Sequence, residues 1–407
     1  MAEAVTLVTL LLGLSLLLVV ISAVRRYTRN FIIPGITILM FLGAILAAVP
    51  MIGIESEKIM EVIPEVILLG FIPILIFDSG RKCKIGQIEK EAIPIGFFAI
   101  IGVILTIFII GFGVSSIFNI PFIDALLFGT ILAATDPVAV SVIFKKFQIP
   151  RKLNLIIEGE SLFNDATGII SFNVVKGIIF SGVAFSLLET SISFIWSMVG
   201  AIALGIAIGW IGGKILDRWK ADVYVDFTFS LGLAIGGYII ADRLLHVSGV
   251  VTTLFVAMLI ITTHKEILSG ARRHFHEYWD YLGFITNSIL FFLIGVPLLT
   301  LERYESIEIP LILIIMVPFV IMMLSRAAVV YGGSAFLRMF RVKIPIQWQN
   351  VLTLGGLREG VAVALVLSLS SEYEFKDLFI SLIIPLIAIN LVVNPILLNQ
   401  YLKKSKM

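Results

Sequence analysis

Long apolar runs separated by short polar connectors alternate along the whole chain. A transmembrane helix needs about 20 predominantly apolar residues, and runs of that length recur from one end of the sequence to the other. The predicted helices cover residues 4–24, 31–50, 62–80, 92–112, 121–144, 153–180, 185–213, 223–241, 247–263, 276–300, 308–337, 345–370 and 377–401. This pattern predicts an all-α membrane protein with thirteen transmembrane helices and connectors too short to form a soluble domain.

The composition supports a lipid environment. Hydrophobic residues make up 59% of the 407 residues and charged residues 14%, with a mean hydropathy of +1.08. A soluble domain could not bury that much apolar surface, so most of the chain is expected to contact lipid. The single cysteine, Cys83, excludes an internal disulfide bond.

The distribution of lysine and arginine predicts the orientation. Most of the 30 Lys and Arg residues lie in connectors reached after odd-numbered predicted helices, and few lie in the others. Cytoplasmic loops collect positive charge, so we expect a multi-pass cell-membrane protein with its N-terminus outside and its C-terminus cytoplasmic. The first run is followed, not preceded, by basic residues (Arg25 and Arg26), which favours a retained helix over a cleaved signal peptide. Because the basic residues follow topology, the net charge of +2 does not indicate a nucleic-acid partner.

Thirteen helices divide naturally into two sets of six joined by one linker helix. The expected units are a first repeat over residues 1–182, a linker helix over 183–221 and a second repeat over 222–407. A single linker span inverts the second set relative to the first, as in many secondary transporters. The fifth helices of the two sets, 121–144 and 345–370, both contain interruptions, and matching interrupted helices indicate a transport site.

The first interruption lies in the stretch ATDPVAV, where Thr135, Asp136 and Pro137 stand together. Pro137 has no N–H, so the carbonyl of Ala133 loses its helical partner and must be satisfied internally or line a wet cavity. Freed carbonyls, a hydroxyl and a carboxylate are hard oxygen ligands of the kind that a hard cation such as Na⁺ or Li⁺ prefers. The alternative is a simple proline kink in which Asp136 pairs with a neighbouring helix.

The next predicted helix carries a polar strip. Its members are four residues apart in pairs, which places them on one side of a helix: Glu160, Ser161, Asn164 and Asp165. A carboxylate within a membrane span is functional by default. Asp136 and Asp165 would then be like-charged neighbours that bind either a cation or protons, and competition for one site is the basis of antiport.

The second interrupted helix contains the stretch GGLREGVAVAL, with Arg358 and Glu359 in the middle of an apolar run. A permanently charged guanidinium near the middle of a membrane needs a carboxylate partner, and Glu160 is the first candidate. Arg326, in another span, is interpreted as a structural ion pair or a side chain that reaches the membrane surface.

The motifs ATDPVAV (134–140), EGESLFNDATGI (158–169) and GGLREGVAVAL (355–365) together resemble those of the monovalent cation:proton antiporter family, in its sodium/proton-exchanger branch of archaeal and bacterial type. The resemblance covers nearly the whole chain. It implies two crossed, unwound helices in a six-helix core, a separate dimerisation domain and a homodimer without a cofactor. The implied ion-binding residues are Asp136, Asp165, Thr135, Ser161 and Glu160.

The resemblance also implies a polar group of Glu160, Asn164 and Arg358 that organises the site next to Pro137. Asn164, rather than an aspartate, before Asp165 resembles the electroneutral branch, which exchanges one Na⁺ for one H⁺. Glu359 departs from the pattern, because relatives often have glycine there.

Na⁺(Li⁺)/H⁺ antiport is the leading hypothesis. K⁺/H⁺ antiport remains open, because ion selectivity depends on distances that the sequence does not reveal. An ion-coupled organic-acid symporter on a similar scaffold would need a wider, aromatic-lined cavity, and a channel would need a repeated pore loop. No HExxH, phosphate-binding glycine loop or GxSxG motif indicates an enzyme.

Overall fold

The computed structural model describes residues 2–28, 31, 34–47, 63–83, 85–136, 138–181, 187–219, 222–264, 273–299, 311–358 and 360–405, and this part of the chain is almost entirely helical. The first-half elements are α1 (Ala2–Thr28), α2 (Gly35–Ala47), η2 (Val66–Phe71), α4 (Ile72–Gly80), α5 (Ile85–Ile88), η3 (Glu89–Glu91), α6 (Ala92–Gly96), η4 (Phe97–Gly102), α7 (Val103–Phe118), α8 (Phe122–Ile131), α9 (Val138–Phe147) and α10 (Arg151–Ser181). The second-half elements are α11 (Leu187–Trp219), α12 (Val223–Ile239), η5 (Ile240–Leu244), α13 (Gly249–Thr263), α15 (Arg273–Gly295), η6 (Val296–Leu299), α17 (Leu311–Leu337), η7 (Arg338–Phe340), α18 (Ile346–Leu354), α19 (Gly360–Leu367) and α20 (Lys376–Ser405).

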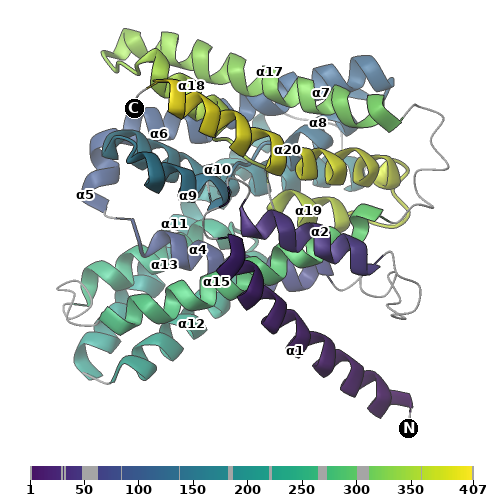
Figure 1. The fold of residues 1–407 in the computed structure, drawn as a ribbon. Helices are drawn as coiled ribbons and strands as arrows, with labels where there is room; N and C mark the ends of the chain where they lie inside the picture. Colours follow the sequence, from purple (N-terminus) through teal and green to yellow (C-terminus); the bar gives the residue numbers. More distant parts are fainter. Residues whose placement is uncertain are drawn as a thin grey trace.

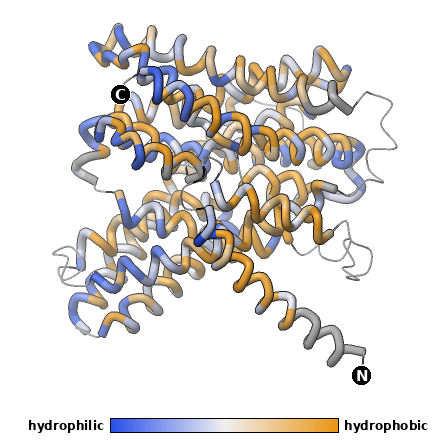
Figure 2. Tube along the Cα trace, viewed as in Figure 1, coloured by the Kyte–Doolittle hydropathy of each residue, from blue (hydrophilic) through white to orange (hydrophobic). Residues whose placement is uncertain are grey.

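The predicted fold class, an all-α membrane protein, is confirmed. Among the described residues, 7 helices are long and apolar enough to cross a membrane: Ile63–Gly80, Glu89–Phe118, Ser191–Trp219, Val223–Leu244, Arg273–Leu298, Met316–Phe340 and Lys376–Ser405. Figure 2 shows apolar residues along most of the length of the helices. Helix is present in each of the predicted runs, whereas the number of membrane crossings stays a prediction.

The helices form two groups that lie side by side (Figure 1). The upper group, which we call the crossing bundle, contains α6 to α10 and α17 to α20. The lower group contains α4, α11, α12, α13 and α15, and α1 extends away from it towards the N-terminus. The crossing bundle therefore combines helices from both predicted repeats, and the repeats themselves stay a prediction.

Two predicted helices are interrupted, as expected. The run 121–144 consists of α8 and α9, with residues 132–136 outside either helix. The run 345–370 consists of α18 and α19, with residues 355–358 outside either helix. Pro137 and Glu359 lie outside the described residues.

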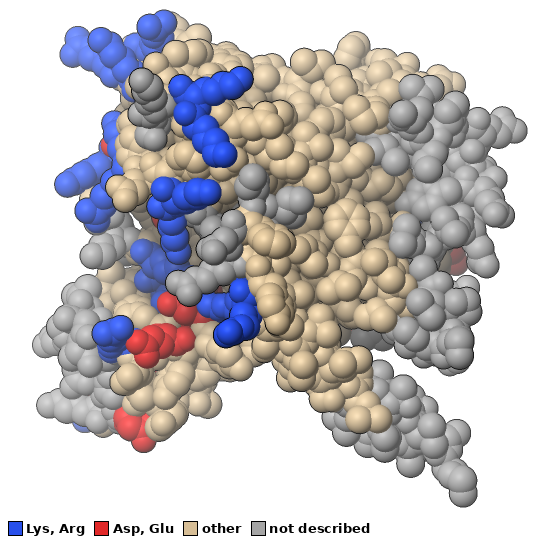
Figure 3. Space-filling model, viewed as in Figure 1, with Lys and Arg blue, Asp and Glu red and all other residues tan. Residues whose placement is uncertain are grey.

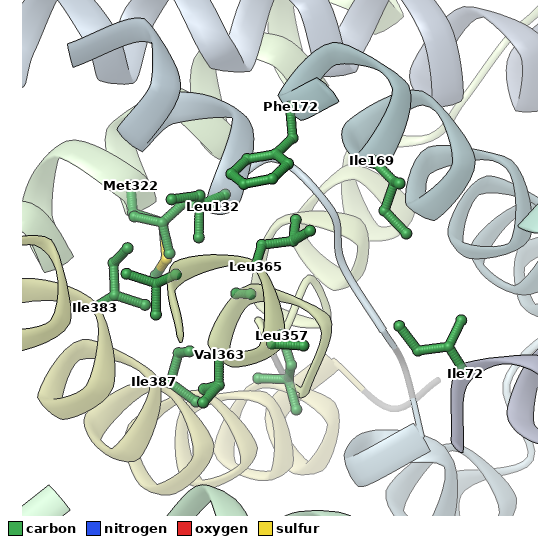
Figure 4. Close-up of a cluster of buried hydrophobic side chains, with 14 of the residues drawn as sticks. Ile72, Leu132, Ile169, Phe172, Met322, Leu357, Val363, Leu365, Ile383 and Ile387 are labelled. Atoms are coloured by element: carbon green, nitrogen blue, oxygen red, sulfur yellow. The ribbon is translucent and has the colours of Figure 1, made fainter. Parts of the chain in front are cut away.

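Apolar side chains surround both interruptions (Figure 4). Leu132 and Leu357 belong to the interrupted segments themselves and are fully buried. Around them lie residues of α10, α17, α19 and α20, including Phe172, Met322, Val363, Leu365, Ile383 and Ile387. The unwound backbone is thus held in a tightly packed, apolar environment, where each unpaired polar group is costly.

Prolines within the long helices also leave carbonyls without partners. Pro395 in α20 lacks an N–H, so the carbonyl of Leu391 has no donor four residues later. The Thr37 hydroxyl of α2 donates to that carbonyl oxygen at 3.5 Å. A neighbouring helix therefore satisfies the group that the proline leaves exposed, which is how membrane helices tolerate proline.

A buried hydrogen bond ties the start of α8 to the connector between α19 and α20. The Tyr373 hydroxyl donates to Asp124 Oδ1 at 2.6 Å, and both residues are buried. Burial and the nearby Asp124 carboxylate raise the pKa of the Tyr373 hydroxyl, so it remains a donor at physiological pH. The bond holds the far ends of the two interrupted helices together.

Replacing Tyr373 with phenylalanine should lower the free energy of unfolding by about 1–3 kcal/mol, because it leaves a buried carboxylate oxygen without its donor. Thermal unfolding of the purified protein in detergent measures the change. Tyr331→Phe is the matched control, since the Tyr331 hydroxyl donates to Asn350 Oδ1 at 2.7 Å on an exposed surface where water can replace it. Equal shifts in the two variants would contradict a special role for the Asp124 contact.

Candidate ion-binding site

The two interrupted helices meet at their unwound segments. The Asp136 N–H donates to the Leu357 carbonyl oxygen at 2.9 Å, and the two residues form an isolated antiparallel bridge. One backbone donor and one backbone acceptor freed by the interruptions therefore satisfy each other. This bridge fixes the backbone of Asp136 relative to the second interrupted helix.

Arg358 satisfies the end of α8. Its Nη1 donates to the carbonyl oxygens of Ala133 at 2.8 Å and Ala134 at 2.7 Å. These carbonyls follow the C-terminus of α8, the negative end of the helix dipole, where a cation is favourable. The Arg358 side chain is almost completely buried, so its charge is placed against dipoles of the first interruption rather than in water.

Arg326 of α17 satisfies the end of α18 in the same way. Its Nε and Nη2 donate to the Leu352 carbonyl oxygen at 3.1 and 3.0 Å. A Cβ at Gly356 would lie 2.8 Å from Arg326 Nε, which explains a glycine at this point of the second interruption. Each interrupted helix thus ends on a guanidinium from another segment.

Glu160 is the carboxylate partner of Arg326. Both of its oxygens accept from the guanidinium: Oε1 from Nη1, and Oε2 from Nη2 at 3.0 Å. Both residues are buried. The prediction that Arg358 pairs with Glu160 is therefore wrong, and the interpretation of Arg326 as a structural ion pair is confirmed.

The polar strip of α10 faces the first interruption. The Asn164 Nδ2 donates to the Thr135 Oγ1 at 2.6 Å, so the amide holds the hydroxyl of the unwound segment. Glu160 lies one turn before Asn164 on the same helix. Glu160 and Asn164 therefore lie on one side of α10, as their spacing in the sequence predicts.

A cavity of about 1040 Å³ reaches the first interruption and the start of α19. Its lining includes Thr135 and Asp136 from the first interruption and Ser161 and Asp165 from α10. These four side chains offer two carboxylates and two hydroxyls to one water-accessible space. Among the described residues, no group of three or more His, Cys, Asp or Glu side chains could hold a metal ion.

The predicted site residues therefore fall into two groups. Thr135, Asp136, Ser161 and Asp165 line the cavity. The other three predicted residues within the described part belong to a set of contacts around the cavity, which we call the frame. Glu160 contacts Arg326, Asn164 contacts Thr135, and Arg358 contacts the carbonyls that follow α8.

The cavity leads away from the site towards basic side chains. Figure 3 shows Lys and Arg gathered along the left side of the molecule; we call this side the basic face. The cavity lining includes basic residues from the connectors rich in Lys and Arg, namely Arg25, Arg26, Lys82 and Lys145. The carboxylates of Asp136 and Asp165 are therefore reached from the basic face.

A cluster of ion pairs lies on the cavity wall formed by α4 and α15. Arg81 is buried and pairs with Asp78 and with Asp280, the latter at 2.6 Å. Lys82 contacts the same two carboxylates, at 2.6 and 3.0 Å. Burial raises the pKa of the neighbouring Cys83 thiol to about 12, so this side chain stays neutral. The acidic groups of this wall, Asp78 and Asp280, are thus matched by cations.

Two buried residues of this frame were not assigned to the site from sequence. Arg326 stood out only as a charge within a span, and Asn390 of α20 was not singled out at all. The Asn390 Oδ1 accepts from the Arg358 N–H at 3.3 Å. In the sequence, Asn390 could have been noticed as a polar amide side chain within the apolar run 377–401.

Replacing Arg326 with methionine should lower the free energy of unfolding by about 3–5 kcal/mol, because it leaves the Glu160 carboxylate buried without its partner. Adding Glu160→Met should recover much of the loss, and thermal unfolding in detergent measures both. The control is Arg243→Met, which removes a half-exposed pair with Glu65 at 3.6 Å and should cost at most about 1 kcal/mol. No recovery in the double variant would contradict the assigned pairing.

Comparison with known proteins agrees with this geometry. Residues 13–404 match the family model described as sodium/hydrogen exchanger, transmembrane. The chain is 33% identical over 353 residues to the Na(+)/H(+) antiporter NhaP of Pseudomonas aeruginosa, covering 82% of this chain and 80% of that protein. It is 30% identical over 399 residues to the Na(+)/H(+) antiporter ApNhaP of Aphanothece halophytica, covering 97% of this chain and 74% of that protein.

The fold is also shared with a solved structure. The sodium proton antiporter MjNhaP1 from Methanocaldococcus jannaschii at pH 8 aligns with a TM-score of 0.80 and 21% sequence identity, covering 97% of this chain and 99% of that chain. The resemblance predicted from the three motifs is confirmed. The chain belongs to the family of transmembrane sodium/hydrogen exchangers.

Proposed function

We propose that this chain exchanges Na⁺ or Li⁺ for H⁺ across a membrane. The observation that carries the proposal is the placement of Asp136 and Asp165 on one cavity together with the hydroxyls of Thr135 and Ser161. Two carboxylates and two neutral oxygens suit a small hard cation. Protonation of the same carboxylates removes the charge that holds the cation, so cation and protons compete for the site.

The frame around the cavity supports an electroneutral exchange of one Na⁺ for one H⁺. The charge of Glu160 is matched by Arg326, and Asn164 contributes a neutral amide to Thr135. The guanidinium of Arg358 is engaged by carbonyl oxygens of the first interruption. Asp136 and Asp165 are then the acidic groups of the exchange, and one Na⁺ bound between them replaces one proton that the two carboxylates share, so the net charge of the site does not change.

We assign Thr135, Asp136, Ser161 and Asp165 as the ion ligands. Glu160 was expected among them, but both of its oxygens accept from Arg326 and it does not line the described cavity wall. We therefore place Glu160 with Asn164 and Arg358 among the residues that organise the site.

The positive charges support an orientation with the basic face in the cytoplasm. The N-terminus would then lie outside and the C-terminus inside, and the cavity of this conformation would open to the cytoplasm. Alternating access requires a second conformation that opens the carboxylates to the other side, with two inverted six-helix repeats on either side of a linker helix as the expected basis. Homodimerisation and thirteen membrane crossings are proposed from the family resemblance and the hydropathy pattern.

Purified protein in sealed vesicles tests the function directly. After a pH gradient is imposed, Na⁺ or Li⁺ should restore the fluorescence of an internal pH dye, and the recovery should be insensitive to an imposed membrane voltage. A response to K⁺ as strong as to Na⁺ would favour K⁺/H⁺ exchange instead. Recovery only with an organic anion would overturn antiport and support a symporter.

Asp165→Asn should abolish the dye recovery while the protein still folds, because the amide cannot exchange a proton for a cation. Asp124→Asn is the matched control: this buried carboxylate lies in the same bundle, accepts from Tyr373 and does not line the described cavity wall. It should retain exchange. Wild-type transport by Asp165→Asn would remove Asp165 from the site.

A further inference from the structure

The long helix α20 of the crossing bundle carries two fully buried asparagines. Asn390 and Asn394 are four residues apart on one face of α20. Ile383 and Ile387 lie on the same face, and Figure 4 shows Ile387 beside Val363 of α19 and Ile383 beside Met322 of α17. This face of α20 therefore packs against α17 and α19, and Asn390 on it contacts the second interruption.

The two asparagines make different contacts. The Asn390 Oδ1 accepts from the Arg358 N–H at 3.3 Å, and its Nδ2 donates to the Met322 sulfur at 3.8 Å. The Asn394 Nδ2 donates to the Met323 sulfur at 3.7 Å. Its Oδ1 is buried with no hydrogen-bond partner among the described residues. Only the Asn390 bond to Arg358 therefore involves the interrupted backbone.

The orientation of the Asn390 amide is determined by its partners. A backbone N–H can only donate, so the amide oxygen must face Arg358. The NH₂ group then faces the Met322 sulfur, which can only accept. The Met322 sulfur of α17 and the Arg358 N–H of the second interruption therefore hold the Asn390 amide in one orientation.

The Arg358 backbone that Asn390 holds is adjacent to the contacts between the two interruptions. Leu357, one residue earlier, accepts the Asp136 N–H. The Arg358 guanidinium binds the carbonyls that precede Thr135. A shift of the Arg358 backbone would therefore move both contacts that position the first interruption.

We propose that Asn390 is a positioning residue for the ion site: it anchors the second interruption to α20 and so sets where Asp136 and Thr135 face the cavity. This inference rests on the proposed cation/proton exchange and deepens it. Asn390 itself does not line the described cavity wall, so it acts through Arg358 and Leu357 rather than on the ion.

The test is the apparent KM for Na⁺ in the vesicle assay. Asn390→Leu keeps the size of the side chain but removes the acceptor, and the loss of one buried hydrogen bond worth about 1 kcal/mol corresponds to a rise in KM of about fivefold. The maximal rate should change less than KM.

Asn394→Leu is the matched control, because it removes an equally buried amide and its sulfur contact one turn away. It should leave KM unchanged. If Asn390→Leu does not fold, Asn390→Ser replaces it, since a serine hydroxyl is too short to reach Arg358 and a smaller side chain cannot overpack the site. The same rise in KM is expected.

The outcomes separate this inference from the function on which it rests. A wild-type KM in the Asn390 variant, or equal rises in the Asn390 and Asn394 variants, would overturn the positioning role while leaving the exchange intact. Absence of Na⁺-driven exchange by the wild-type protein would overturn the proposed function, and the inference with it. A raised KM confined to the Asn390→Leu or Asn390→Ser variant would support both.

Discussion

Two helices end inside an apolar bundle, and their unpaired backbone groups must find hydrogen-bond partners there. At and just beyond the ends of α8 and α18, several backbone carbonyls lack donors four residues later, and lipid or apolar side chains cannot supply any. Two arginines supply them: Arg358 donates to Ala133 and Ala134, and Arg326 donates to Leu352. The bridge between Asp136 and Leu357 satisfies a further donor and acceptor.

This solution determines how the remaining charges are arranged. A guanidinium buried in a membrane bundle needs a counter-charge or an equivalent set of dipoles. Arg326 has Glu160, and Arg358 has the carbonyls at the negative end of α8. The carboxylates of Asp136 and Asp165 line the cavity, where we propose that they bind the transported ion.

The frame is built from long continuous helices around the short interrupted ones. α10 contributes Glu160, Asn164 and Asp165 within two turns, α17 contributes Arg326, and α20 contributes Asn390. A site on unwound backbone can be held in place only if rigid elements contact it on several sides. The likeness to MjNhaP1, with a TM-score of 0.80 at 21% identity, indicates that this arrangement of helices persists through extensive sequence change.

Features that depend on local chemistry could be predicted from the sequence. Apolar runs and their basic connectors identified a helical membrane protein, Pro137 and the stretch GGLREGVAVAL indicated the interruptions, and the spacing of Ser161 and Asp165 placed them on one side of a helix. The pairing of the charges could not be predicted, because it depends on how distant helices pack. An arginine side chain is long and can reach several carboxylates, so the partner of Arg326, which lies 166 residues away at Glu160, depended on the packing of α10 against α17. The contact of the Arg358 backbone with Asn390, 32 residues away, likewise depended on the packing of α20 against the second interruption.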